Sequence, residues 1–199
     1  MIVHTGKRVT LGRFFAALTG GLLMLAAGLG TAHASPGAEP FAQQARAAHL
    51  STDQTTALKS EVNRYLKLTG GQQVALNKIV IPGRGEVLVA LPGEAHPRSF
   101  GSGVAAAVDH CLGADAPLYD GWFCAYYSAN FQGTEVQWYT CGTYDMNFTT
   151  HGGSWSNNQT RGRQARMYGK SGNLIYTTPG AYSSDASANW WSIWKIKPC

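Results

Sequence analysis

Few side chains in the sequence could carry out acid–base or nucleophilic chemistry, and their spacing forms no known motif. The candidates are two histidines and four acids: His110, His151, Asp120, Glu135, Asp145 and Asp185. A nucleophilic site needs a serine or cysteine beside a histidine that a third group orients, and a glycosidase needs a pair of carboxylates. Nothing in the spacing selects two of these acids, and His151 lies in a glycine-rich turn. We therefore expect no catalytic residues and a protein that is not an enzyme.

Tryptophans near the end of the chain could bind a ligand rather than catalyse a reaction. Trp190, Trp191 and Trp194 lie within the run WWSIWKI. In an extended strand successive side chains alternate between two faces, so both faces of this run would carry aromatic rings. Burial of one face in a β-sheet explains part of the set, and the other rings would form a stacking platform. A non-catalytic module that binds the cell wall or a glycan is therefore our alternative function.

The start of the chain predicts export. A basic run over residues 7–13 precedes an apolar stretch over residues 14–30, and Ala32-His33-Ala34 fits the small-x-small cleavage rule. The apolar stretch is shorter than the roughly 20 residues of a membrane-spanning helix. We interpret residues 1–34 as a signal peptide. The mature protein is then secreted and extracellular, begins at Ser35, and has no membrane segment.

Export decides how the charges and cysteines are interpreted. All 11 acidic residues but only 13 of the 16 basic residues follow Ala34, which leaves a net charge of +2 on the mature chain. This weak charge argues against binding to nucleic acid. The cysteines are an even set with no CxxC pair: Cys111, Cys124, Cys141 and Cys199. In an oxidising compartment such a set predicts disulfides rather than a zinc site.

Composition divides the mature chain into two unlike halves. No tryptophan or cysteine occurs in residues 35–109, whereas all six tryptophans and all four cysteines follow His110. We expect a helix and a β-hairpin over residues 35–92, a linker rich in Pro, Gly and Ser over residues 93–109, and a β-rich domain over residues 110–199. The first segment could be a small domain, a pro-region that is removed, or a layer packed on the second unit.

Local signals specify the helix and hairpin of the first half. The run Ser51-Thr52-Asp53-Gln54 resembles a capping box, and Gly70-Gly71 would end the helix. One face of this helix collects apolar residues at spacings of three and four: Leu58, Val62, Tyr65 and Leu66. The runs 74–81 and 86–91 are β-rich and flank a Pro-Gly-Arg-Gly turn.

The second half has the pattern of an all-β protein. Short aromatic and β-branched runs alternate with Gly, Asn and Ser clusters, as in a sandwich or barrel. A weak internal similarity with an offset near 40 residues suggests two copies of one β-unit. The segment Phe123–Cys141 is interpreted as a hairpin, in which Tyr126 and Phe131 cover a folded corner while Gly133 takes a positive φ.

This corner pattern resembles the Greek-key signature of the βγ-crystallin superfamily. The elements GWFCAY, NFQG, CG and SWSNNQT, over residues 120–199, are similar to those of the secreted actinobacterial βγ-crystallin-like peptidase inhibitors, the Streptomyces metalloproteinase inhibitor type. The resemblance implies a mainly β fold, with a βγ-crystallin-like Greek-key β-sandwich after a small α+β segment. It also implies inhibition of a secreted protease, such as a metalloprotease, through exposed loops. Tyr144–Gly153 and Thr177–Ala188 are the candidate loops.

The resemblance also bears on metal and disulfides. The superfamily's calcium signature would fall at Thr149–Ser154 and Ser187–Ser192, but neither segment has the paired acids or amides that supply calcium's oxygen ligands. We expect no cofactor and at most weak calcium binding. Four cysteines allow three connectivities. Our hypothesis is that Cys124 bonds Cys141 across the hairpin and that Cys111 bonds Cys199.

Overall fold

The structure, a computed structural model, describes residues 41–113, 120–146 and 148–199. The predicted signal peptide and the predicted start at Ser35 lie outside the described residues. The elements are α1 (Ala42–Ala47), α2 (Thr52–Thr69), β1 (Gln72–Ala75), β2 (Lys78–Ile81), β3 (Gly85–Leu88), the 3-10 turn η1 (Gly103–Ala105), β4 (Trp122–Ser128), β5 (Gln132–Trp138), β6 (Tyr144–Asp145), β7 (Ser154–Asn158), β8 (Arg166–Tyr168), β9 (Leu174–Thr177), β10 (Ser183–Asp185) and β11 (Lys195–Lys197).

Helix α2 confirms the helix that the capping signal predicts. The Ser51 hydroxyl accepts a hydrogen bond from the Gln54 N–H, and the Gln54 side chain accepts one from the Ser51 N–H, so two of the N–H groups that lack a partner within the helix are satisfied. The helix ends at Gly70, whose φ of 65° is left-handed. Three of its apolar residues are buried against the sheet: Leu58, Val62 and Tyr65.

The strands of the first half are shorter than predicted: β3 ends at Leu88 rather than at Leu91. The run predicted as a single strand over residues 74–81 is two strands, β1 and β2, separated by a turn at Leu76 and Asn77. The Asn77 amide donates to the carbonyl oxygens of Val89 and Arg98. An asparagine whose side chain satisfies backbone groups favours a turn over a continuous strand.

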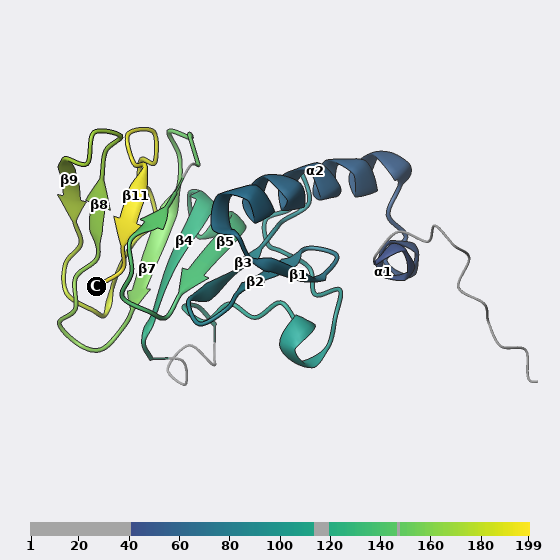
Figure 1. Ribbon diagram of the computed structural model, residues 1–199, viewed down its shortest axis with the longest axis horizontal. Coiled ribbons are helices and arrows are strands. Elements are labelled where there is room, and N and C mark those ends of the chain that lie inside the picture. Colours follow the sequence, from purple (N-terminus) through teal and green to yellow (C-terminus); the bar gives the residue numbers. More distant parts are fainter. Residues whose placement is uncertain (1–40, 114–119, 147) are drawn as a thin grey trace, which may run out of the picture. The chain divides into compact units, whose positions relative to one another are not determined.

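The first half is joined to the second by one continuous sheet. The strand order is β1-β2-β3-β5-β4-β7-β10, and β3 pairs with β5 so that Val87 lies opposite Val136. The described residues accordingly belong to one compact unit. The helix and hairpin pack on the second half, as a packed layer would (Figure 1).

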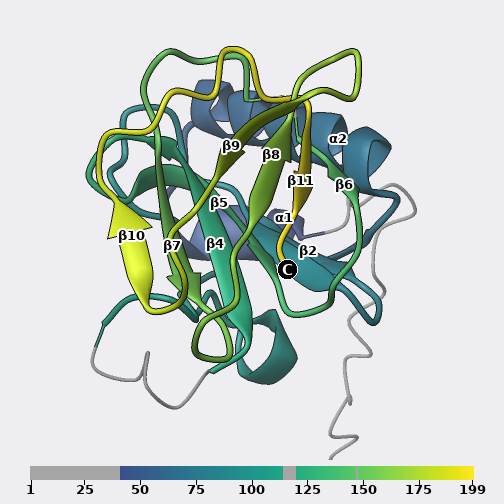
Figure 2. The ribbon, with the colours of Figure 1, turned by 90° about the vertical axis from the view of Figure 1, so that its left-hand side faces the viewer.

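The second half contains two sets of four consecutive strands that exchange one strand each. The second sheet has the order β6-β11-β8-β9, so β6 leaves the set β4–β7 to pair with β11. In return β10, from the set β8–β11, pairs with β7 in the larger sheet. Figure 2 shows the two sheets with the connections β6–β7, β8–β9 and β10–β11 gathered at one end. The fold is mainly β, as predicted.

The two faces of the larger sheet have opposite character. Its inner face is apolar and includes Phe123, Val136, Trp138 and Trp155, which belong to one core cluster with the residues of α2. Its outer face carries buried polar side chains from four strands: Lys78, Glu86, Tyr126, Glu135 and Gln137.

Residues 98–112 lie across this outer face, and we call this segment the strap. Lys78 Nζ donates to Ala106 O at 2.7 Å, Gln137 Nε2 donates to Val108 O at 2.8 Å, and the Tyr126 hydroxyl donates to the Asp109 carboxylate at 3.0 Å. Most of the strap was interpreted from composition as a linker. Instead it supplies the partners that buried polar groups require.

The fold predicts that residues 110–199 are not stable alone. Removing residues 35–109 would leave the β5 edge unpaired and the outer face of the sheet uncovered. We expect the fragment to aggregate or to melt at least about 10 °C below the mature chain, because a loss of about 2 kcal/mol has this effect in a domain of such size. Circular dichroism melting and size-exclusion chromatography would test it. Equal stability of the two proteins would contradict the role given to the β3–β5 pairing.

Candidate functional site

The most exposed ordered segment of the second half is the hairpin end formed by residues 170–177, which we call the β9 arm. Every residue from Lys170 to Tyr176 is exposed. Strand β9 ends the order of the smaller sheet, and among the described residues its only neighbour is β8. One edge of its backbone is therefore available to pair with another chain.

The exposed side chains of the arm are unusually apolar. Leu174 is 54% exposed, Ile175 is 44% exposed and Tyr176 is 41% exposed. Consecutive residues of a strand point to opposite faces, so both faces of the arm keep exposed apolar surface, although the Tyr176 ring lies beside the buried Trp155 with centroids 6.2 Å apart. Large apolar side chains in a contiguous exposed run often mark a site of interaction.

Hydrogen bonds fix the arm at both ends. In the turn, the Gly169 N–H donates to Asn173 O and the Gly172 N–H donates to Gly169 O, each at 2.9 Å. Gly172 takes a φ of 80°, which other residues resist. At the other end Thr178 is buried, and its hydroxyl accepts the Ala165 N–H at 2.9 Å. The arm is thus an extended segment held in one conformation.

The structure does not support Thr177–Ala188 as an exposed loop. It contains β10, which pairs with β7, and several of its residues are buried: Thr178, Ala181 and Ala188. The other candidate, Tyr144–Gly153, begins with β6 and buries Met146 and Phe148. Sequence analysis missed the arm because NLIYTT has the composition of an ordinary buried strand. The Lys-Ser-Gly-Asn turn before it was the available signal of a protruding hairpin.

The corner residues take the geometry that their pattern predicts. Tyr126 and Phe131 meet edge to face with ring centroids 5.6 Å apart, and Gly133 has a φ of 81°. The Ser154 hydroxyl accepts the Phe131 N–H at 2.8 Å and donates to Ser128 O at 2.7 Å. The corner is therefore tied to β7, and its role is to support the scaffold.

All four cysteines form disulfides, but the predicted pairing is wrong. Cys111 bonds Cys124, and Cys141 bonds Cys199. The register of the β4–β5 hairpin places Gln137 opposite Cys124, and Cys141 lies four residues further along. Four extended residues cover about 13 Å, well beyond the Cα separation of a disulfide.

Of the acids and histidines proposed as catalytic candidates, His110 and Glu135 both lie at the strap, near Glu86, and the others lie in separate places. Glu135 is buried beneath the strap, where burial and then the neighbouring Asp109 raise its pKa well above 4.5. His110 stacks on Trp122 and His151 stacks on Trp191. Asp145 pairs with Lys195, and Asp185 accepts the Ser187 N–H. Asp120 is exposed before β4. No pocket in the described part of the chain unites these side chains.

The tryptophan run is not the strand that alternation predicts. Only Lys195–Lys197 is a strand, and the residues before it form a turn. Trp190 is buried, and its indole N–H donates to Tyr126 O at 2.8 Å. Trp191 and Trp194 are exposed. Any binding platform therefore excludes Trp190.

In the segments 149–154 and 187–192, where the calcium signature would fall, serine side chains and backbone groups make hydrogen bonds within the protein. Ser154 is committed to the corner, and Ser187 lies in a turn that Asp185 closes. Among the described residues, one group of potential metal ligands lies close together: Asp109, Cys111 and Cys124. The two sulfurs of that group are bonded to each other, so they cannot ligate as thiolates.

Comparisons with known proteins found no match. No family model, no curated protein and no solved structure is similar to the chain. Within the described residues, none of the helices combines the length and the apolar character that crossing a membrane requires.

The buried Glu135 predicts a pH dependence of stability. As pH rises from about 4.5 toward the raised pKa, the unfolded chain loses a proton that the folded chain keeps, so stability falls. In Glu135→Gln this loss should shrink by roughly 1 kcal/mol or more between about pH 5 and pH 8. Urea unfolding across this range would measure it. Asp145→Asn, at an exposed pair, is the control; parallel profiles for Glu135→Gln and the unmodified protein would refute the assignment.

The two disulfides should differ in reactivity toward thiols. Cys111 and Cys124 are buried, whereas Cys141 is exposed and its sulfur accepts a hydrogen bond from Arg163 at 2.9 Å. A cation beside the sulfur stabilises the departing thiolate. Timed alkylation and mass spectrometry should find the Cys141–Cys199 bond reduced first, and more slowly in Arg163→Gln. Earlier opening of the Cys111–Cys124 bond would contradict this order.

Proposed function

We propose that the protein is a secreted peptidase inhibitor that places the β9 arm in the substrate cleft of an extracellular protease. One observation carries the proposal: Leu174, Ile175 and Tyr176 are exposed together on an extended edge strand that is held rigid at both ends. A peptide that enters a cleft in an extended form adds backbone hydrogen bonds along one edge, and its side chains fill alternate pockets.

The fold gives independent support to the resemblance on which the inhibitor hypothesis first rested. The exchange of β6 and β10 between the two sheets is the connectivity expected of two interlocked Greek keys. The rings of Tyr126 and Phe131 meet edge to face at the β4–β5 corner, and the Ser154 hydroxyl accepts the Phe131 N–H, which supports the resemblance drawn from the pattern of residues. These features favour a βγ-crystallin-like sandwich, and that resemblance implies peptidase inhibition.

Rigidity is what would separate an inhibitor from a substrate. A flexible loop loses conformational entropy when it enters a cleft, whereas the arm is already paired with β8. The Cys141–Cys199 bond fixes the end of β11, which pairs with β8 in turn. Interfaces between proteases and inhibitors bury about 800 Å² on each side, which the arm and its neighbouring turns can supply.

The test is inhibition of a panel of secreted proteases, including a thermolysin-like metalloprotease, by the mature chain. We expect tight inhibition of at least one enzyme and a loss of at least about 100-fold in affinity for Ile175→Lys, equivalent to about 2.7 kcal/mol. The lysine charge would have to lose its water in the substrate cleft of the protease. In the free protein residue 175 is half exposed, so the charge stays hydrated there.

A matched variant guards against general effects of surface charge. Tyr182→Lys changes an exposed aromatic residue outside the arm and should leave inhibition unchanged. Melting temperatures of both variants would show that the fold is intact. Inhibition of no protease would refute the proposed function, and equal inhibition by Ile175→Lys would remove the arm from it.

A further inference from the structure

Two connections at one end of the sandwich are locked together by aromatic pairs. Phe148, between β6 and β7, lies edge-on to Trp190 with ring centroids 5.9 Å apart. His151, on the same connection, stacks on Trp191 with centroids 4.5 Å apart. Both connections lie at the upper end of the molecule in Figure 2. They form one surface, built from two loops that brace each other.

The two neighbouring tryptophans on this surface have different roles. Trp190 is buried, and a Cβ on Gly153 would lie only 2.0 Å from its Nε1, so the scaffold is packed around it. Trp191 is 57% exposed, and His151 covers one face of its ring. The packing of the core explains Trp190 but leaves most of Trp191 in water.

A second exposed tryptophan lies nearby. Trp194 is partly covered by Lys170, whose Nζ is 4.9 Å from the ring centroid. The backbone on either side is fixed, since the Trp194 N–H donates to Tyr168 O and Trp194 O accepts the Met146 N–H. Two exposed indoles, three residues apart, are thus held on a rigid turn.

A cleft opens on the other side of the same loop. It has a volume of about 460 Å³ and lies between α2, the segment 90–94 and the β4–β5 corner. Aromatic rings and hydroxyl groups line it together: Tyr65, Tyr127, Phe148, Ser128, Thr134 and Thr149. Its volume is within the range of sites for small ligands. Since Phe148 and Thr149 belong to the loop that carries His151, the cleft and Trp191 flank one loop.

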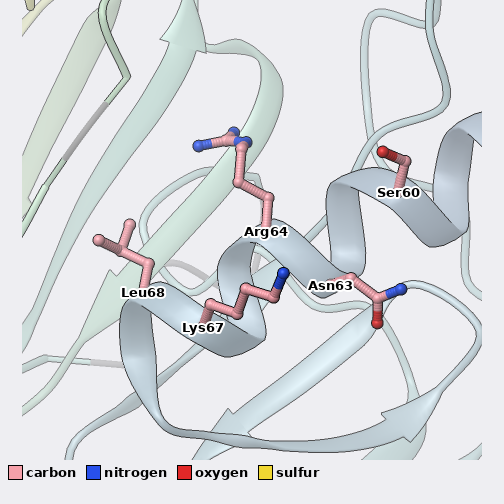
Figure 3. Close-up of a pocket in the computed structure, with 5 residues that line it drawn as sticks. All are labelled: Ser60, Asn63, Arg64, Lys67 and Leu68. Carbon is pink, nitrogen blue, oxygen red and sulfur yellow. The ribbon is translucent and has the colours of Figure 1, made fainter.

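The charges around the cleft are balanced. Arg64 pairs with Glu61 at 2.9 Å, and Glu94 pairs with Arg98. A larger hollow of about 600 Å³ on α2 is lined, among the described residues, by that helix alone, and Figure 3 shows its five side chains. A surface on one helix offers no enclosure, so we assign no ligand to it. Balanced charge at the cleft favours an uncharged ligand over a polyanion.

We propose that the cleft and the exposed Trp191 form a binding groove for an uncharged glycan chain. A sugar ring has an apolar C–H face that can stack on an indole and hydroxyl groups at its edge that can bond to serine and threonine side chains. One sugar unit lies on Trp191, and the following units enter the cleft past Thr149. This role is independent of the β9 arm and would hold an inhibitor at a glycan-rich surface.

The experiment titrates the mature chain with the hexamers of N-acetylglucosamine and of glucose, and measures binding by calorimetry. We expect binding of at least one hexamer. In Trp191→Ala the affinity should fall at least about 10-fold, or about 1.4 kcal/mol. Tyr182→Ala, which removes an exposed aromatic residue elsewhere, should bind normally.

The outcomes separate this groove from the inhibitory arm. Two independent sites predict opposite results for the two variants. Ile175→Lys should bind the glycan but lose inhibition, and Trp191→Ala should inhibit the protease but lose glycan binding. Absence of binding to both hexamers would overturn the glycan proposal, and so would unchanged binding by Trp191→Ala. A loss of inhibition in Trp191→Ala would assign the surface to the protease contact and would likewise overturn it.

Discussion

The pairing of β3 with β5 is the interaction on which the rest of the structure depends. It joins the β2–β3 hairpin of the first half to the β4–β5 hairpin of the second. The resulting sheet continues from beneath α2 to the core of the sandwich. Tyr65 of α2 meets Phe148 of the second half edge to face, so side chains reinforce what the backbone joins. The cleft exists because this pairing brings α2 beside the β4–β5 corner.

The outer face of the sheet explains why the strap cannot be a passive connection. Lys78 and Glu86 are buried as an ion pair at 2.9 Å, and buried charges need both a partner and further hydrogen bonds. The strap supplies them through its carbonyl groups and through Asp109, which also accepts the N–H groups of Cys111 and Leu112. The Cys111–Cys124 bond then anchors the strap at the centre of the sheet. Polar burial therefore specifies where the segment lies.

Local patterns could be predicted from the sequence, whereas pairings between distant residues could not. The capping box at Ser51 and the positive φ at Gly133 depend on a few adjacent residues, and both follow the prediction. The disulfides depend on strand register, and the register places Gln137 opposite Cys124. The burial of Trp190 beside an exposed Trp191 depends on the close approach of Gly153, far away in sequence, which has no side chain to collide with the indole. Composition gave no sign of which tryptophan the core would take.

Both proposed sites use apolar side chains that stay exposed to water. Leu174, Ile175 and Trp191 remain about half exposed, although burying the rest of each side chain would be favourable. They lie on backbone that is firmly held, by β8 in one case and by the aromatic loop pairs in the other. Exposure without rigidity would indicate a frayed segment. Exposure on rigid backbone keeps apolar surface ready for a partner, which both proposed sites require.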